Sequence, residues 1–225
     1  MTEPPATVTA ASRRRRERRW APAAAVLFLA CLPVLLPGRL TLGPGWLVVP
    51  VGIVFTVMLL VVDPMQDTRR IAVLRPLMVG LTVLLIVVAA WMTWRLTEDL
   101  IQGGPSTSSG TALLSTGTLV WIYNNVLFGL LYWELDSGGP VVRAVRPRPY
   151  PDLAFQQHLN PQVAPPGWRP IFADYLYLGL TNALAFSPTD VMPLALIAKA
   201  MMALQSLISF IIVGLVIARA VNVLT

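Results

Sequence analysis

The sequence predicts an all-α, polytopic helical membrane protein with about five transmembrane helices and one short re-entrant helix. Of its 225 residues, 56% are hydrophobic and only 12% are charged, whereas about a quarter of the residues in a soluble domain carry charge. The mean hydropathy is +0.67, and several apolar runs approach the length that crosses a bilayer. A multi-pass protein of the plasma membrane is the expected class.

The first segment, residues 1–19, is polar and predicted to be a disordered arm. It carries a run of six arginines directly before Trp20: Arg13, Arg14, Arg15, Arg16, Arg18 and Arg19. An arm that binds nucleic acid could have this composition. Because the run leads directly into an apolar segment, we favour an anchor on anionic lipid headgroups and expect no nucleic-acid partner.

The second region, residues 20–134, is predicted to hold four transmembrane helices. Their apolar runs cover about 20–36, 45–62, 76–96 and 112–133, and Pro, Gly or charged residues end each one. A short basic loop with Arg69, Arg70 and Arg75 separates the second run from the third. Residues 97–111 are expected to form a flexible polar loop.

The third region, residues 135–171, is a proline-rich extramembrane loop, in which Gly138-Gly139-Pro140 is interpreted as a turn. The last region, residues 172–225, begins with an apolar helix over about 172–186. That helix is too short to cross a bilayer comfortably, which favours a re-entrant element. A fifth span is predicted over about 191–217.

Charge predicts the topology. The arginine run places the N-terminus in the cytoplasm. Alternation from there makes the basic 63–75 loop cytoplasmic, the slightly acidic 97–111 loop external and the 135–170 loop cytoplasmic, with a basic balance that fits.

The stretch from Asp174 to Pro193 resembles the pore module of tetrameric potassium and cation channels. Tyr175-Leu-Tyr177 begins a short helix, and Asp190 and Pro193 stand where the filter-terminal Asp and its following Pro stand in that family. The resemblance implies a re-entrant pore helix, a tetrameric homo-oligomer and a monovalent cation. The glycine filter is replaced by residues 185–189, which contain no glycine, so potassium selectivity by stacked carbonyls is not expected.

The resemblance and the charge pattern disagree on sidedness. In the channel family the pore loop enters from outside, whereas five full spans after a cytoplasmic N-terminus make it enter from the cytoplasm. A conventional orientation would require that the first two spans, which are interrupted by prolines, include a non-spanning hairpin half. Both topologies stay open at this point.

Ser187, Thr189 and Asp190 are the candidate pore mouth, where hydroxyls and a ring of carboxylates would attract cations. The alternative for Asp190 is a helix cap, because Ser-Pro-Thr-Asp before an apolar run is typical of a helix start. The two roles are compatible.

The fifth span carries a moderately polar stripe at three- and four-residue spacing: Met202, Gln205, Ser206 and Ser209. Such a stripe can line a water-filled path. It can equally pack helices together, which we favour because small and amide side chains commonly join membrane helices.

Three further polar residues lie inside apolar runs. Asn124 and Asn125 need a partner from another helix or from water. Trp121, Asn125, Phe128 and Tyr132 share one face, which we expect to meet the short helix or the fifth span. Lys199 is either functional or a snorkelling side chain, with Asp174 and Asp190 as candidate partners.

Enzymatic chemistry has little support. His158 is the only histidine and Cys31 the only cysteine, so we expect no metal, no cofactor and no catalytic Cys–His pair. Three hypotheses remain: a cation channel or degenerate channel homologue, a non-conducting membrane scaffold or accessory subunit, and a membrane enzyme or carrier with a site in the 135–170 loop.

Overall fold

The computed structural model describes residues 20–61, 68–104, 107–145, 148, 150–185 and 190–224. The described chain is mostly helical, as predicted, and departs from an all-α fold only by a pair of three-residue strands. The elements are α1 Trp20–Cys31, α2 Val48–Val61, α3 Thr68–Gln102, α4 Gly110–Leu135, α5 Pro140–Val145, β1 Leu153–Phe155, α6 Gln156–Leu159, α7 Phe172–Ala185, β2 Val191–Pro193 and α8 Leu196–Leu224. The arginine run of the arm, Ser187 and Thr189 lie outside the described residues.

Three helices in the described part are long and apolar enough to cross a membrane: Leu77–Gln102, Gly110–Gly138 and Leu196–Asn222. They indicate a membrane protein. The first two apolar segments are shorter, Trp20–Leu35 and Gly45–Leu60, and each ends or begins in a 3₁₀ turn.

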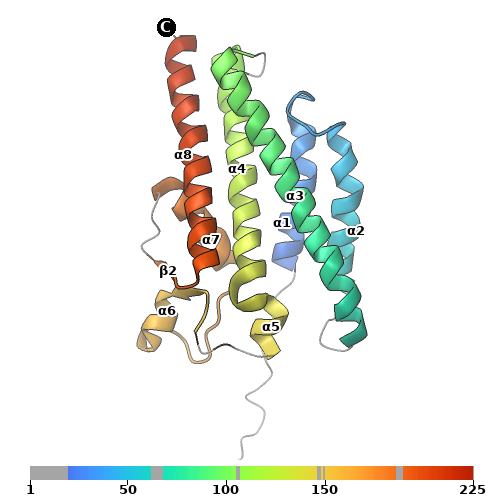
Figure 1. Ribbon diagram of the computed structural model, residues 1–225, viewed down its shortest axis with the longest axis vertical. Coiled ribbons are helices and arrows are strands. Elements are labelled where there is room, and N and C mark those ends of the chain that lie inside the picture. The colour runs from blue at the N-terminus through green and yellow to red at the C-terminus, as the bar shows by residue number, and fades with distance from the viewer. Residues whose placement is uncertain are drawn as a thin grey trace, which may run out of the picture.

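The long helices alternate in direction (Figure 1). Contacts fix this order: Arg39, after α1, pairs with Asp99 near the end of α3, and a side chain on Gly103 would meet Arg219 near the end of α8. The start of α1, the end of α4, the described residues of 136–171, the start of α7 and β2 therefore lie at one end of the bundle, which we call the proximal end. The 36–47 turn, Gly103 and the end of α8 lie at the distal end.

Helix α3 is longer than the predicted third span. It begins at Thr68 and ends at Gln102, so the three arginines expected in a loop lie on its first turns and the expected loop at 97–111 shrinks to a tight connection. Asp99 is buried there, and its carbonyl accepts hydrogen bonds from the Gly103 and Gly104 amides and the Thr107 hydroxyl. Charged side chains are tolerated at helix ends where they reach polar surroundings.

Helix α7 packs along α4 and α8 but reaches only part of the way up the bundle. It starts beside the end of α4, and its last turn meets the middle of α8, where the Ala183 carbonyl accepts from the Ser209 hydroxyl at 2.8 Å. At a rise of about 1.5 Å per residue, Ser209 lies roughly 20 Å along α8. The chain has returned to the proximal end at β2. Helix α7 therefore runs along only about half of the bundle, and the chain enters and leaves that half from the proximal end.

The predicted fifth span corresponds to α8, which starts later than predicted, and Asp190 is not the N-cap of α8. Residues Val191–Pro193 form β2, which pairs antiparallel with β1 so that Val191 faces Phe155 and Pro193 faces Leu153. Helix α8 begins only at Leu196. The local Ser-Pro-Thr-Asp signal for a helix start is overridden by pairing between strands 36 to 40 positions apart, which no local pattern reveals.

The proline-rich segment is largely structured where it is described. A 3₁₀ turn at Asp136–Gly138, then α5, β1, α6 and a second 3₁₀ turn cover the proximal ends of α4, α7 and α8 (Figure 1). We call residues 136–171, as far as they are described, the cap.

Candidate functional site

A buried polar network joins α4, α7 and α8 inside the bundle. Its members are Asn125 and Tyr132 on α4, Asn182 on α7, and Gln205 and Ser206 on α8. All of them except Ser206 are buried, although they lie on apolar helices. Buried amides and hydroxyls are tolerated only when they are hydrogen-bonded, so the network fixes how these helices meet.

Gln205 is the centre of the network and is only 2% exposed. Its Oε1 accepts from the Tyr132 hydroxyl at 2.7 Å and from Asn182 Nδ2 at 2.8 Å. Its Nε2 donates to the Gly179 carbonyl at 2.7 Å and to Asn125 Oδ1 at 3.4 Å. The hydrogen-bonding capacity of the side chain is thus directed at α4 and α7.

Asn182 connects α7 to α8 from the other side. Its Nδ2 also donates to the Met202 carbonyl at 2.9 Å, and its Oδ1 accepts from the Ser206 hydroxyl at 3.2 Å. Three residues of the predicted stripe, Met202, Gln205 and Ser206, therefore bind one amide side chain of α7. In the structure this face of α8 is a helix-packing face.

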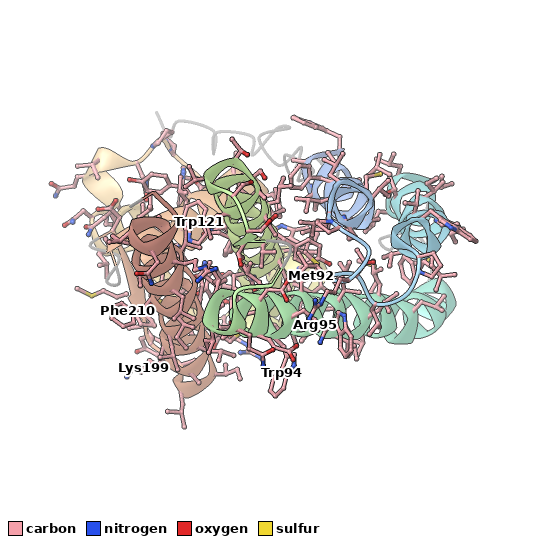
Figure 2. The ribbon with its side chains drawn as sticks, turned by 90° about the horizontal axis from the view of Figure 1, so that it is seen from above. Met92, Trp94, Arg95, Trp121, Lys199 and Phe210 are labelled. Atoms are coloured by element: carbon pink, nitrogen blue, oxygen red, sulfur yellow. The ribbon has the colours of Figure 1, made fainter. Side chains whose placement is uncertain are left out.

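The fourth stripe residue, Ser209, links α4 to the end of α7. Its hydroxyl accepts from the Trp121 indole at 2.8 Å and donates to the Ala183 carbonyl at 2.8 Å. Figure 2 shows Trp121 pointing between the helices. The face of Trp121, Asn125 and Tyr132 thus meets both α7 and α8, which confirms the expected contact.

Two glycines let α7 approach α4 closely. A Cβ on Gly179 would lie 3.0 Å from the Asn125 carbonyl oxygen, and one on Gly129 would lie 3.0 Å from the Leu176 Cα. Small residues at a helix crossing permit this backbone proximity. The short helix is therefore held by shape as well as by hydrogen bonds.

Asn124 faces a different helix from its neighbour Asn125. Its Nδ2 donates to the Thr93 hydroxyl of α3 at 3.1 Å and to the Val120 carbonyl at 3.0 Å. The two adjacent amides thereby tie α4 to α3 on one side and to α8 on the other.

Lys199 and Asp190 lie apart from the network. Lys199 is exposed in the first turn of α8. Figure 2 shows both Lys199 and Phe210 on the outer side of the bundle. No ion pair joins Lys199 to Asp174 or Asp190 within the described residues. Asp190 is exposed at the proximal end, where its Oδ2 accepts from the Tyr177 hydroxyl at 3.3 Å.

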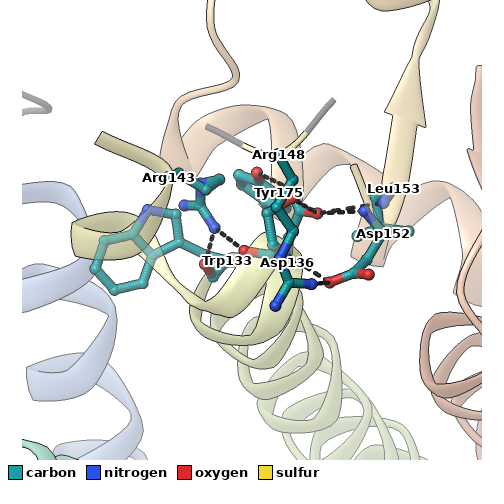
Figure 3. Close-up of polar contacts among 8 residues, drawn as sticks. Trp133, Asp136, Arg143, Arg148, Asp152, Leu153 and Tyr175 are labelled. Carbon is teal, nitrogen blue, oxygen red and sulfur yellow. Dashed lines mark hydrogen bonds and ion pairs between the residues drawn. The ribbon is translucent and has the colours of Figure 1, made fainter. Parts of the chain in front are cut away.

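A second polar cluster, centred on Asp136, holds the cap to the bundle (Figure 3). Asp136 is 2% exposed. Its Oδ1 accepts from the Asp152 and Leu153 amides and the Ser137 hydroxyl, and its Oδ2 accepts from the Tyr175 hydroxyl at 2.6 Å. One carboxylate therefore fixes the end of α4, the start of β1 and the first turn of α7.

The turn after Asp136 requires left-handed backbone at three successive positions, Ser137 (φ 54°), Gly138 (φ 84°) and Gly139 (φ 93°). This reverses the chain, so that Arg143 Nη1 donates to the Trp133 and Asp136 carbonyls, both at 2.7 Å. These carbonyls belong to the last turn of α4 and its cap, which an arginine can satisfy. A second carboxylate, Asp152, accepts from the Ser137 amide at 2.7 Å and pairs with Arg148 at 3.5 Å.

An aromatic cluster forms the core of the cap. The Phe155 ring lies edge-on to Tyr175, Trp168 and His158, with centroids 5.3 to 6.0 Å apart. His158 lies at the exposed edge of this cluster. Partial burial lowers its pKa, and the nearby Asp136 carboxylate opposes that effect. At the first turn of α7, burial raises the pKa of Asp174, although the Ile171 amide donates to its Oδ2 at 2.7 Å.

Sequence reasoning missed Asn182 and the Asp136 cluster. Asn182 lies on the predicted short helix one turn beyond Gly179, and its position opposite the stripe could have marked it. Asp136 directly precedes the Ser-Gly-Gly turn, but nothing local shows that its carboxylate would be buried by residues 16 to 39 positions later.

The described residues contain no group of three or more His, Cys, Asp or Glu side chains that could hold a metal ion. Comparisons with protein-family models, with curated proteins and with solved structures find no match to this chain.

Proposed function

We propose that the protein is a non-conducting membrane scaffold or accessory subunit of the plasma membrane, with five spans and a re-entrant α7. In this proposal the proximal end is cytoplasmic, the arginine arm binds anionic headgroups there, and the cap is the surface offered to a partner protein. α1 and α2 cross as short spans, which a bilayer accommodates by thinning locally.

One observation carries the proposal: three inward-facing polar side chains of α8, those of Gln205, Ser206 and Ser209, are hydrogen-bonded to α7 and α4. A conducting path needs polar groups that face a water-filled lumen. Gln205 instead directs its four hydrogen bonds at two neighbouring helices, α4 and α7, three of them to side chains and one to a backbone carbonyl. This arrangement supports a role in holding α7 and the cap in place.

The cation-channel hypothesis is the second candidate, favoured by the sequence of half-length helix, return and long helix. Asp190 lies exposed near that return, where several copies around an axis would place a ring of carboxylates. The proximal location of the α7 segment requires that such a pore open from the cytoplasmic side, opposite to the orientation in the family it resembles.

Reconstitution into proteoliposomes distinguishes the two candidates. The scaffold proposal expects no potassium or sodium flux above that of empty liposomes, for the parent and for Asp190→Asn alike. A flux in the parent that Asp190→Asn lowers would overturn it in favour of conduction.

Labelling of single cysteines tests the topology in a Cys31→Ser background. Val163, which is 72% exposed in the cap, and Gly38, which has open space at the distal turn, are the two sites. Val163→Cys should be protected from a membrane-impermeant reagent in intact cells, and Gly38→Cys should react. The reverse pattern would contradict the proposed orientation.

Crosslinking in native membranes tests the partner surface. A photoreactive residue at Tyr150 or Val163 in the cap should give one discrete crosslinked protein band, and one at Leu207 on the outer face of α8 should not. Asp136→Ala, which releases the cap, should abolish the band. A band that survives Asp136→Ala would separate the cap from partner binding.

A further inference from the structure

The imidazole of His158 occupies the corner where β1 turns into α6. Its Nδ1 accepts a hydrogen bond from the Phe155 amide at 3.2 Å. The His158 ring lies edge-on to Trp168, with centroids 5.2 Å apart and an interplanar angle of 73°. The His158 side chain therefore caps the start of the four-residue helix α6 and packs against the Trp168 ring of the aromatic cluster.

This hydrogen bond occupies Nδ1, the nitrogen at which the neutral imidazole would be protonated. A neutral histidine that accepts at Nδ1 carries its hydrogen on Nε2, so Nδ1 is its one basic atom. A proton that arrives from solvent must bind at Nδ1 and displace the Phe155 N–H. The bond and the protonated state exclude each other.

The residue that loses its partner is central to the proximal end. Phe155 pairs with Val191 in β2, next to the start of α8, and its ring lies 5.3 Å from the ring of Tyr175 on α7. Both Phe155 and Tyr175 are buried. A change at the β1–α6 corner therefore reaches the cap, β2 and the first turn of α7 through direct contacts.

The titratable and charged groups around the imidazole come from the elements packed on this corner. The end of α4 contributes Asp136, whose charge acts on His158. Helix α7 contributes Tyr175 beyond the Phe155 ring, and Arg143 of α5 lies over the Tyr175 ring at 5.2 Å. β1 and the 160–168 segment present Phe155 and Trp168, which do not titrate.

We propose that His158 is a proton-operated latch: its neutral imidazole holds the β1–α6 corner closed, and proton binding at Nδ1 releases α6 and the segment that follows it from Phe155. The device does not depend on whether the protein conducts ions or binds a partner. It makes the cap responsive to the pH on the proximal side.

Hydrogen–deuterium exchange with correction for intrinsic rates tests the latch in the full chain without a histidine tag. Between about pH 7.5 and about pH 4.5, a range that extends well below the ordinary pKa of histidine because partial burial lowers the pKa of His158, amides of 155–159 should exchange faster at the lower pH. We expect an increase of roughly two- to tenfold, the population change that loss of one hydrogen bond produces. Amides in the middle of α4 should not respond.

Two variants give the matched comparison. His158→Asn places an uncharged acceptor oxygen close to the Nδ1 position and should abolish the pH response. Gln157→Asn changes the neighbouring α6 residue, keeps the imidazole and should retain the response. A response that survives His158→Asn would overturn the proposal.

The parent protein provides a test that does not depend on folding of a variant. Because the chain has one histidine, its imidazole proton resonances report a single titration. The midpoint of the exchange response should coincide with that titration. An imidazole that titrates while exchange at 155–159 stays constant would refute the latch.

Discussion

The α1–α2 hairpin and the α4–α7–α8 unit solve helix packing in different ways. In the hairpin, Gly52 packs against Ala30 so closely that a Cβ on Gly52 would collide with the Ala30 Cβ, and the Thr56 hydroxyl donates a hydrogen bond of 3.3 Å to the Ala23 carbonyl. In the α4–α7–α8 unit, side-chain amides and hydroxyls cross between all three helices.

The difference follows from the interactions that are available to hold each unit together. Between helices in lipid there is no hydrophobic driving force, so packing and hydrogen bonds decide association. The hairpin of two apolar segments is held together by its 36–47 connection, by close packing and by the single Thr56 bond. A half-length helix such as α7 must also stop at a defined depth, and directional bonds to Asn182 and Gly179 define that depth.

Removal of the Asp136 carboxylate is the substitution with the largest expected effect on stability. Asp136→Ala leaves the Tyr175 hydroxyl and two backbone amides without their acceptor, and we expect a loss of about 3 to 5 kcal/mol in the free energy of unfolding. Unfolding by SDS in mixed micelles measures it. Asp190→Ala, a carboxylate change at an exposed position, is the control and should cost less than about 1 kcal/mol.

Gln205→Leu tests whether the network is the main support of α7. It removes four hydrogen bonds from a buried site, and we expect a loss of about 2 to 3 kcal/mol, since single bonds between membrane helices are modest. Leu204→Met on the outer face of α8 should change stability by less than about 0.5 kcal/mol. A variant as stable as the parent would show that apolar contacts alone hold α7.

Gly52→Ala examines the hairpin in the same assay. The added methyl group collides with Ala30, which should force α1 and α2 apart and cost about 1 to 2 kcal/mol. Gly80→Ala on α3, where no atom lies within 4 Å of the new Cβ, should instead be neutral or stabilising by up to about 1 kcal/mol. Equal effects of the two substitutions would argue against shape as the basis of the hairpin.

The smallest expected effect concerns pH. Because burial raises the pKa of Asp174, the folded protein keeps this proton to a higher pH than the unfolded chain does. Its contribution to stability is full below the unfolded pKa of about 3.9 and declines as pH rises through the folded pKa. Asp174→Asn should therefore gain stability relative to the parent as pH rises from about 4 to about 6. Parallel pH profiles would contradict this assignment.

The long helices, the half-length α7 and the contact face of α4 could be predicted because each depends on local hydropathy and helical spacing. Trp121, Asn125 and Tyr132 recur on one face of an apolar run, and polar groups there must find partners. The polar stripe of α8 could also be predicted from its spacing. That Asn182 of α7 is its partner could be learned only from the three-dimensional structure.

The proximal end was beyond sequence reasoning. The start of α8 at Leu196 depends on pairing between β1 and β2, and the burial of Asp136 depends on Tyr175 and Leu153 arriving from later in the chain. A proline-rich segment with few apolar residues gives no periodic signal for such contacts. Its order comes from two carboxylates, Asp136 and Asp152, from Arg143 and from a cluster of aromatic rings.

The half-length of α7 makes the bundle unequal at its two ends. Along the proximal half, α7 packs beside α4 and α8, and beyond Ala185 it adds nothing to the cross-section (Figure 1). In the membrane orientation proposed above, α7 therefore takes up area in the proximal leaflet that it does not take up in the distal one. A helix that stops halfway is thus a source of asymmetry between the two leaflets.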